Sequence, residues 1–294
     1  MVGDKSISRG LFVIANTIFL VMLSFICIAP VMHVLFASVS DPILLLRSHG
    51  LLLWPKGFTL RGYELVIRNP NIINGFRNSV FYMTAGTILN ILLTSMGAYV
   101  CSRKNFPFGN FVIFMITFTM FFNGGLIPYY LLVKGIGLTD KPWALIIPPA
   151  ISAYNLIIMR TAFSQIPDSL EESATIDGAN DFTILFRIIM PVAKAVVAVM
   201  VLIYAVGHWN SWFSAMIFLR DRRLYPLQLI LREILIQNDT NRIMAVADAG
   251  NQLDIYKPLI RYSTIIVSIV PIMCIYPFIQ KYFVTGIMIG SLKG

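Results

Sequence analysis

Charged residues are scarce in this chain of 294 residues: only 13% are Asp, Glu, Lys or Arg, against roughly 25% in an ordinary soluble domain. Apolar residues make up 57% of the sequence, and the mean hydropathy is +0.76. This balance excludes a soluble enzyme, a nucleic-acid-binding protein, a coiled coil and a disordered chain, because each of these needs a larger polar surface.

Cysteine and histidine are also scarce, with three residues of each. Cys27, Cys101 and Cys274 lie in or beside separate apolar stretches, and no pair has the spacing of metal ligands. They support neither a disulfide framework nor a zinc site, and apolar packing is the simpler interpretation. The histidines are scattered, so we predict no catalytic residue and no metal site.

Six stretches contain no charged residue, and together they hold half of the chain: 10–40, 78–102, 105–133, 142–159, 195–219 and 262–280. A membrane-spanning helix needs about 20 apolar residues, and a charge at mid-bilayer costs roughly 2.5–3.5 kcal/mol. The sequence therefore predicts a single all-α polytopic membrane domain over 1–294. Its six transmembrane helices are expected at 11–39, 76–101, 108–133, 143–161, 193–218 and 260–280.

The first predicted span resembles the start of a signal sequence, with Lys5 and Arg9 ahead of an apolar run from Leu11. That run is about twice the 7–15 residues of a secretory core. We expect an uncleaved first span that also acts as the signal anchor.

A charged segment at 162–191 separates the fourth and fifth predicted spans. Pro167 suits the first position of a helix, and acids follow at Asp168, Glu171 and Glu172, where the helix dipole favours them. Gly178 permits the left-handed turn that ends a helix. These features predict a first short amphipathic helix.

A second short helix is predicted after this turn. Phe182, Leu185, Phe186 and Ile189 recur at helical spacing and predict one apolar face, and Pro191 marks the entry into the fifth span. Such a hairpin could dock a soluble partner or lie on lipid, and the residues alone favour neither alternative.

The charged segment resembles the EAA loop of ABC-importer permeases, whose pattern is Glu-Ala-Ala, Asp-Gly-Ala, a hydrophobic run and Pro. The matching residues are Glu172-Ser173-Ala174, Asp177-Gly178-Ala179, Phe186, Ile189 and Pro191. Ser173 in place of the middle Ala is the one departure, and it exchanges one small residue for another.

Two further stretches are similar to MalG-like carbohydrate permeases: the tail 280–294, and 209–213 in the fifth span. The resemblance is greatest to the complex-oligosaccharide and polysaccharide branch, including permeases of the alginate-oligosaccharide type. It implies the type I importer permease fold and uptake of an oligosaccharide.

The resemblance also implies partners, because such permeases carry no ATPase of their own, and no G-x-x-x-x-G-K-[ST] loop occurs here. Expected partners are two ATP-binding cassette subunits that bind ATP and Mg, a second homologous permease subunit and an extracytoplasmic substrate-binding protein. No cofactor and no nucleic acid is expected on this chain. The implied coupling residues are Glu171, Glu172, Ala174, Asp177, Gly178, Ala179, Phe182, Phe186 and Pro191, and those of the tail at the ATPase interface are Gly286, Gly290, Lys293 and Gly294.

Loops at 40–75 and 219–259 are expected on the outer side. The second matches in position a loop that such permeases extend toward the binding protein, with candidate contacts at Arg220, Arg222, Arg223 and Arg232. The alternative is a solvated loop that faces lipid headgroups.

Candidate pathway residues are Trp209, Asn210 and Trp212, with Tyr204, His208, Asn90 and Asn123 as a wider set. Sugars bind through aromatic faces and hydrogen bonds. Interfacial anchoring by Trp and helix linking by Asn are the alternatives. In the maltose system it is the paired subunit, not the MalG-like one, that holds the sugar.

A coupling loop must face the ATPases, so both termini are expected in the cytoplasm and the protein in the bacterial inner membrane. The basic residues oppose this orientation, with nine inside and thirteen outside. We give the motif more weight than the count.

The alternative functions are a secondary transporter and a membrane-embedded enzyme without an ATPase partner. The first would need ionisable residues within its spans, and the second would need clustered acids or histidines at a membrane face.

Thirteen basic residues against eight acids make the outer face positive. This indicates either an acidic oligosaccharide, such as a uronate oligomer, or an acidic binding protein that delivers a neutral sugar.

Overall fold

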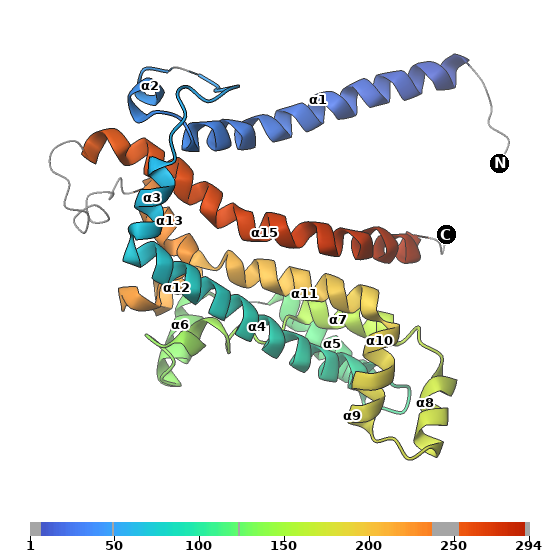
Figure 1. Cartoon of the computed structure of the whole chain (residues 1–294). Helices are drawn as coiled ribbons and strands as arrows, with labels where there is room; N and C mark the ends of the chain where they lie inside the picture. The colour runs from blue at the N-terminus through green and yellow to red at the C-terminus, as the bar shows by residue number, and fades with distance from the viewer. Residues whose placement is uncertain (1–6, 49, 123, 237–252, 292–294) are drawn as a thin grey trace. The chain divides into compact units, whose positions relative to one another are not determined.

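The computed structural model describes residues 7–48, 50–122, 124–236 and 253–291 (Figure 1). Within these residues the regular structure is helical, apart from one isolated bridge between Ser40 and Phe58. The chain divides into two compact units, one of 1–70 with 233–269 and one of 71–232 with 270–294.

The helices follow one another as α1 (Ile7–Ser38), α2 (Pro42–Leu46), α3 (Arg61–Arg68), α4 (Pro70–Ser102), α5 (Gly109–Phe121), α6 (Leu126–Gly135), α7 (Ala153–Phe163), α8 (Asp168–Ile176), α9 (Asp181–Ile184), α10 (Met190–Val192), α11 (Lys194–Trp209), α12 (Trp212–Phe218), α13 (Leu227–Ile236) and α15 (Leu253–Ser291). Short 3-10 turns lie at Pro142–Leu145 and Arg222–Leu224, and a π turn at Leu185–Ile189 joins α9 to α10.

Three helical stretches are long and apolar enough to cross a membrane: Arg9–Ser38, Pro70–Ser102 and Ile255–Ile275. The number rises to five if each of two bent pairs is counted as one span, α5 with α6, and Asp181–Val192 with α11. The second pair is bent by 91°. This count covers only the described residues, so the presence of six spans stays a prediction.

The predicted span at 143–161 is built differently from one continuous helix. A 3-10 turn is followed by irregular backbone with Pro148 and Pro149, and α7 begins only at Ala153. Proline has no N–H and clashes with the preceding turn, so two consecutive prolines stop a helix. The absence of charged residues therefore predicts an apolar segment here, but it does not predict that the helix is interrupted at the two prolines.

The first unit includes residues 40–70 of the predicted outer loop, and side-chain contacts hold this part in place. Asp41 caps α2 by accepting from the N–H groups of Ile43 and Leu44. The hydroxyls of Ser38 and Tyr63 lie 2.7 Å apart, which joins the end of α1 to α3. This segment thus contains two short helices, of which α3 is tied to the end of α1.

The second unit has a buried apolar core that brings four parts of the chain together. Its residues come from α4, α7, the 166–189 segment and α11: Ala98, Tyr99, Met159, Phe163, Ile166, Ala174, Ile184, Leu185, Ile189 and Met200. Because the 166–189 segment contributes half of this core, the charged hairpin is packed onto the unit and does not hang from it as a loose loop.

Candidate functional site

The charged segment folds as the predicted helical hairpin, and its turn has a defined geometry. Gly178 has φ +82°, a backbone conformation that residues other than glycine rarely adopt. Its N–H donates to Thr175 O at 3.0 Å, and the N–H of Ala179 donates to Ala174 O at 2.9 Å. This is the Schellman arrangement that ends a helix, so the glycine is required by the backbone.

The second arm begins with its own cap. The side chain of Asn180 accepts a hydrogen bond from the N–H of Thr183 at 2.8 Å. Asparagine is among the preferred residues at this position, because its oxygen satisfies a backbone donor of the first turn. Because the turn at Gly178 stops α8 and the cap at Asn180 starts α9, the direction of the hairpin turn is fixed.

The predicted single apolar face of the second arm needs correction. Leu185 and Ile189 are buried in the core, whereas Phe182 is 61% exposed and Phe186 is 40% exposed. Each buried residue follows an exposed phenylalanine by three positions. At helical spacing, the buried pair and the exposed pair therefore point in directions about 60° apart. Only the buried pair reaches the core, and the phenylalanines face outward.

The end of α8 adds a third exposed apolar side chain, because Ile176 is 86% exposed. Together with Phe182 and Phe186 it gives the outer side of the hairpin three apolar residues that the second unit does not cover. Such residues around a polar turn are typical of a protein contact surface.

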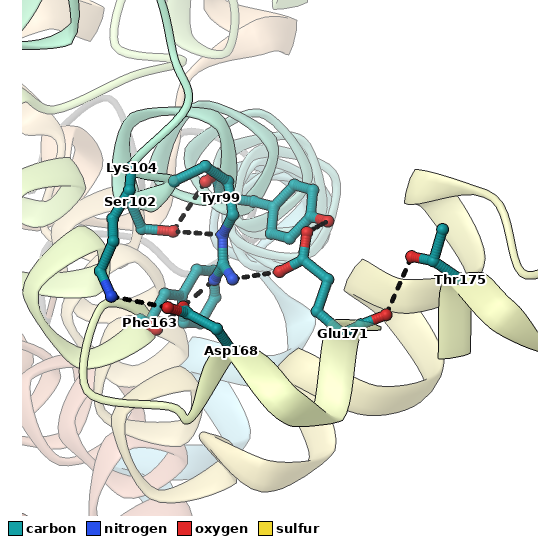
Figure 2. Close-up of polar contacts among 8 residues, drawn as sticks. Tyr99, Ser102, Lys104, Phe163, Asp168, Glu171 and Thr175 are labelled. Atoms are coloured by element: carbon teal, nitrogen blue, oxygen red, sulfur yellow. Dashed lines mark hydrogen bonds and ion pairs between the residues drawn. The ribbon is translucent and has the colours of Figure 1, made fainter. Parts of the chain in front are cut away.

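The acids of α8 connect the hairpin to the end of α4 (Figure 2). The Arg103 guanidinium pairs with the Glu171 carboxylate and lies over the Tyr99 ring, 4.8 Å from its centre. The Tyr99 hydroxyl donates to Glu171 Oε1 at 2.8 Å. Both partners of this ion pair are mostly buried, so the pair is better shielded from water than an exposed surface bridge.

A second ion pair lies at the start of α8, where Lys104 Nζ is 2.6 Å from Asp168 Oδ2 (Figure 2). The hydrogen bond from Lys104 lowers the pKa of the Asp168 carboxyl, and the same bond raises the pKa of the Lys104 amine. Both groups therefore keep their charges at neutral pH. Because the carboxyl pKa is lowered, the pair is lost only when acidification reaches that lowered value.

The remaining predicted coupling residues divide between the two sides of the hairpin. Ala174 is buried in the core and Ala179 packs against it, whereas Glu172, Asp177 and Pro191 are exposed. Pro191 lies in α10, just before the 91° bend into α11. The structure thus separates Glu171, which is used within the chain, from Glu172, which faces outward.

The attachment residues Tyr99, Arg103 and Lys104 were missed by the sequence analysis. A signal was present, since Arg103 and Lys104 form a basic pair at the end of a charge-free stretch and the acids of 168–172 follow later in the chain. Pairing them requires knowing that α4 ends beside α8, which charge patterning alone does not reveal.

The pathway candidates lie in three different environments. Trp209 is fully buried, with its ring edge-on to Phe76 at 5.8 Å, which favours a packing role. Asn210 is exposed where α11 ends. Trp212 is half-buried, and the Arg232 guanidinium lies 4.4 Å from its ring centre.

The loop after α12, which we predict to lie on the outer side, is held by hydrogen bonds within the second unit. Asp140 Oδ1 accepts from the N–H groups of Arg220 and Asp221 at 2.9 and 2.8 Å, and these bonds lower its pKa. The side chain of Arg223 forms an ion pair with Asp221. Of the four arginines predicted to contact a binding protein, Arg220 and Arg223 therefore lie on a fixed loop, Arg222 lies beside them in the 3-10 turn, and Arg232 lies over Trp212.

Part of the predicted tail lies outside the described residues. Gly286 and Gly290 belong to the last turns of α15, whereas Lys293 and Gly294 fall beyond the described part. Asn123 of the wider pathway set and 237–252 of the outer loop are outside it as well.

Comparison with known proteins identifies the family. The family described as "Binding-protein-dependent transport system inner membrane component" matches residues 108–289, which include the hairpin and most of the core beneath it. The chain belongs to this family. It is therefore a permease, the membrane component of an ABC transporter, and the family name implies a binding protein as a partner.

Relatives along almost the whole length agree with this membership. The polygalacturonan/rhamnogalacturonan transport system permease protein YtcP of Bacillus subtilis is 38% identical over 94% of this chain and 96% of its own. The arabinooligosaccharides transport system permease protein AraQ of the same organism is 27% identical over 96% of both.

A solved structure confirms the type I importer permease fold. It is a chain of a bacterial ABC transporter involved in the import of the acidic polysaccharide alginate. The TM-score is 0.86 at 29% identity, and the match covers 96% of this permease and all of that chain.

We predict that Arg103→Gln loosens α8. The change leaves the mostly buried Glu171 carboxylate without its cation, and a hydrogen bond to a charged group contributes about 1.5–3 kcal/mol. Deuterium exchange of the backbone amides of 168–176 is expected to become at least about tenfold faster in the purified complex. Arg68→Gln is the matched control, because Arg68 pairs with Glu64 in an exposed bridge on α3. Equal exchange in Arg103→Gln and wild type would contradict the role of this pair.

Proposed function

We propose that this permease belongs to an ATP-driven importer that carries an oligosaccharide across the bacterial cytoplasmic membrane after delivery by a substrate-binding protein. The observation that carries the proposal is the hairpin: its acids, Gly178 and Pro191 have the family spacing, and it is packed onto a core shared with α4, α7 and α11. The names of the relatives, which give polygalacturonan, rhamnogalacturonan and arabinooligosaccharides, support a carbohydrate as the substrate class.

In the proposed mechanism the hairpin lies in a groove on an ATP-binding subunit. The exposed side chains of Ile176, Phe182 and Phe186 would make the apolar contact, and the exposed Glu172 and Asp177 would make polar contacts around it. Closure of the two ATP-binding subunits would then pull the hairpins of the two permeases together and switch the pathway between inward- and outward-facing states.

The contacts within the chain supply two routes for this movement. One runs from α8 to the end of α4 through the Glu171–Arg103 and Asp168–Lys104 pairs. The other runs from α10 into α11 across the bend at Ala193. There are two routes because the first arm of the hairpin is paired with α4 and the second arm continues into α11.

The proposed assembly contains this subunit, a second homologous permease and two ATP-binding subunits, with the tail around Gly286 and Gly290 near the ATPase interface. ATP and Mg would be bound by those partners, so we assign no catalytic residue, metal or cofactor to this chain. The outer loop after α12, with Arg220, Arg222, Arg223 and Arg232, is assigned to contact with the binding protein.

Gly178→Val is expected to uncouple transport from ATP hydrolysis. A β-branched residue at φ +82° is strained by about 1–2 kcal/mol, which distorts the hairpin turn. Gly178→Asn is the matched control, because asparagine tolerates the left-handed region. Glu172→Lys, which reverses an exposed charge, is expected to act like Gly178→Val. The measurement is sugar transported per ATP hydrolysed in vesicles that contain the complex. Unchanged uptake and unchanged co-purification of the ATPase in both variants would refute the assignment.

Both termini are proposed to face the cytoplasm, as the position of the hairpin requires. Reporter fusions after Asn105 and Gly294 are therefore expected to be active only with a cytoplasmic reporter, and a fusion after Gly57 only with a periplasmic one. Activity of a periplasm-only reporter after Asn105 or Gly294 would reverse the topology.

The positive outer face is proposed to favour an acidic oligosaccharide, an interpretation that the alginate transporter's structural similarity supports. Uptake of a uronate oligomer is expected to exceed that of a neutral oligomer of equal length at low salt. The difference should narrow near 1 M salt, where the screening length is about 3 Å. Equal uptake, or a response that salt does not change, would favour a neutral sugar delivered by an acidic binding protein.

A further inference from the structure

A cavity of about 380 Å³ lies within the second unit, away from the charged hairpin. Its walls come from α6, the irregular 142–152 segment, α7, α11 and α12. The polar residues among the described lining are Tyr129, Ser152, Asn155, Tyr204, His208, Ser211 and Ser214, and none of the lining residues carries a formal charge. The cavity has the size of a small-ligand site and the usual mixture of apolar walls with a few polar groups.

One wall of the cavity is fixed by a buried hydrogen-bond network. The two N–H groups of the Asn90 side chain donate to Pro149 O at 2.6 Å and Ala150 O at 2.8 Å. Both amide hydrogens are thus used, so Asn90 Oδ1 must act as an acceptor, and His208 Nε2 lies 2.6 Å from it. The hydrogen of His208 is therefore assigned to Nε2.

This assignment leaves the second ring nitrogen of His208 with a lone pair. In the neutral imidazole Nδ1 is an acceptor, and no hydrogen bond to it is found in the described part of the chain. The ring is held against α4, where a Cβ on Gly86 would lie 2.5 Å from its Cε1 atom. His208 is thus a positioned acceptor on the cavity wall.

Tyr204 is positioned in the same way. Its hydroxyl lies 2.7 Å from Thr94 Oγ1 and accepts from the N–H of Ser152 at 3.3 Å. Because the hydroxyl is held by α4 and by the cap of α7, the ring stays in place along the cavity. An aromatic face held in this way suits the apolar side of a sugar ring.

Asn155 is the observation that points to a ligand. The residue is only 4% exposed and lines the cavity, yet its side-chain amide has no hydrogen-bond partner among the described residues. Its backbone N–H donates to Ser152 Oγ at 3.4 Å and takes no part in the cavity. The amide is open to the cavity, so a group that enters can donate a hydrogen bond to its oxygen and accept one from its nitrogen.

We propose that this cavity binds the hydroxyl groups of a sugar ring during transport, with Asn155 donating to and accepting from hydroxyls, His208 accepting from one, and the Tyr204 ring stacking on the apolar face. The inference rests on the proposed function and adds that this subunit itself contacts the cargo. Since the lining carries no charge, the site recognises hydroxyl groups, and any carboxylate of the sugar is contacted by other parts of the pathway.

The competing occupant is a helix of the second permease subunit. Gly207, Ser211 and Ser214 are small residues on the cavity wall, and small residues are common where membrane helices pack closely. The two occupants differ in what happens when the cavity is filled, because a packed helix would be expelled from the complex whereas a sugar site would lose only uptake.

The test uses the complete transporter in vesicles, with ATP inside and the binding protein loaded with a neutral or an acidic oligosaccharide outside. Asn155→Leu removes the amide at similar volume, and Gly207→Leu fills the cavity from a position with nothing within 4 Å of an added Cβ. The matched controls are Thr161→Val, an exposed site on the same helix as Asn155, and Gly10→Leu, another glycine with open space.

Each of the two cavity variants is expected to raise the KM for uptake about tenfold, for neutral and acidic oligosaccharides alike, while the partner permease still co-purifies. The controls are expected to match wild type. An unchanged KM in both cavity variants would overturn the proposal, and so would loss of the partner permease from Gly207→Leu but not from Gly10→Leu.

A protection measurement keeps the proposal testable if Asn155→Leu fails to fold. Gly207→Cys is labelled with a maleimide, and modification of that peptide is measured with and without oligosaccharide during ATP hydrolysis. Protection by the sugar at residue 207, but not in Gly10→Cys, is expected, and equal labelling with and without sugar would overturn the site. If wild-type vesicles take up no oligosaccharide at all, the proposed function itself fails, whereas normal wild-type uptake with insensitive variants refutes the cavity alone.

Discussion

The structure depends on one constraint of the membrane: backbone polar groups that leave a helix must find partners inside the protein, because lipid offers none. The chain meets this constraint at the 148–150 break, where prolines prevent a helix. The Asn90 side chain donates to the carbonyls of Pro149 and Ala150 there. A polar residue in an apolar stretch is thus what permits a non-helical segment beside α4, and the break in turn makes room for the cavity.

Within the second unit, α4 organises three regions along its length (Figure 1). Near its start, Asn78, Ser79 and Tyr82 bond to the backbone of 223–227 and hold the loop after α12. In its middle, Asn90 and Thr94 hold the cavity wall. At its end, Tyr99 and Arg103 hold the hairpin. One continuous helix therefore contacts the elements that we assign to delivery, passage and energy coupling.

Much of this arrangement could be predicted from the sequence, for identifiable reasons. Charge-free stretches mark apolar segments, and the acids, Gly178 and Pro191 mark the hairpin, because helix dipoles, left-handed turns and missing N–H groups act locally. The attachment of Glu171 to Arg103 and the contact of His208 with Asn90 join residues 68 and 118 positions apart. No local rule pairs such residues, so the sequence analysis had Glu171 as a coupling residue but not its partner.

The two kinds of attachment on α4 differ in strength and purpose. The loop after α12 and the cavity wall are held to α4 by neutral hydrogen bonds, each contributing about 0.5–1.5 kcal/mol. The hairpin is held by the mostly buried Arg103–Glu171 pair, where a hydrogen bond between charged groups contributes about 1.5–3 kcal/mol. A hairpin that is pulled by ATP-driven closure needs the firmer connection, because a weak one would yield before α4 moved. The acids of α8 therefore serve two needs: Glu171, together with Asp168 at the surface, pairs with the end of α4 to hold the hairpin, and Glu172 remains outside for the ATP-binding partner.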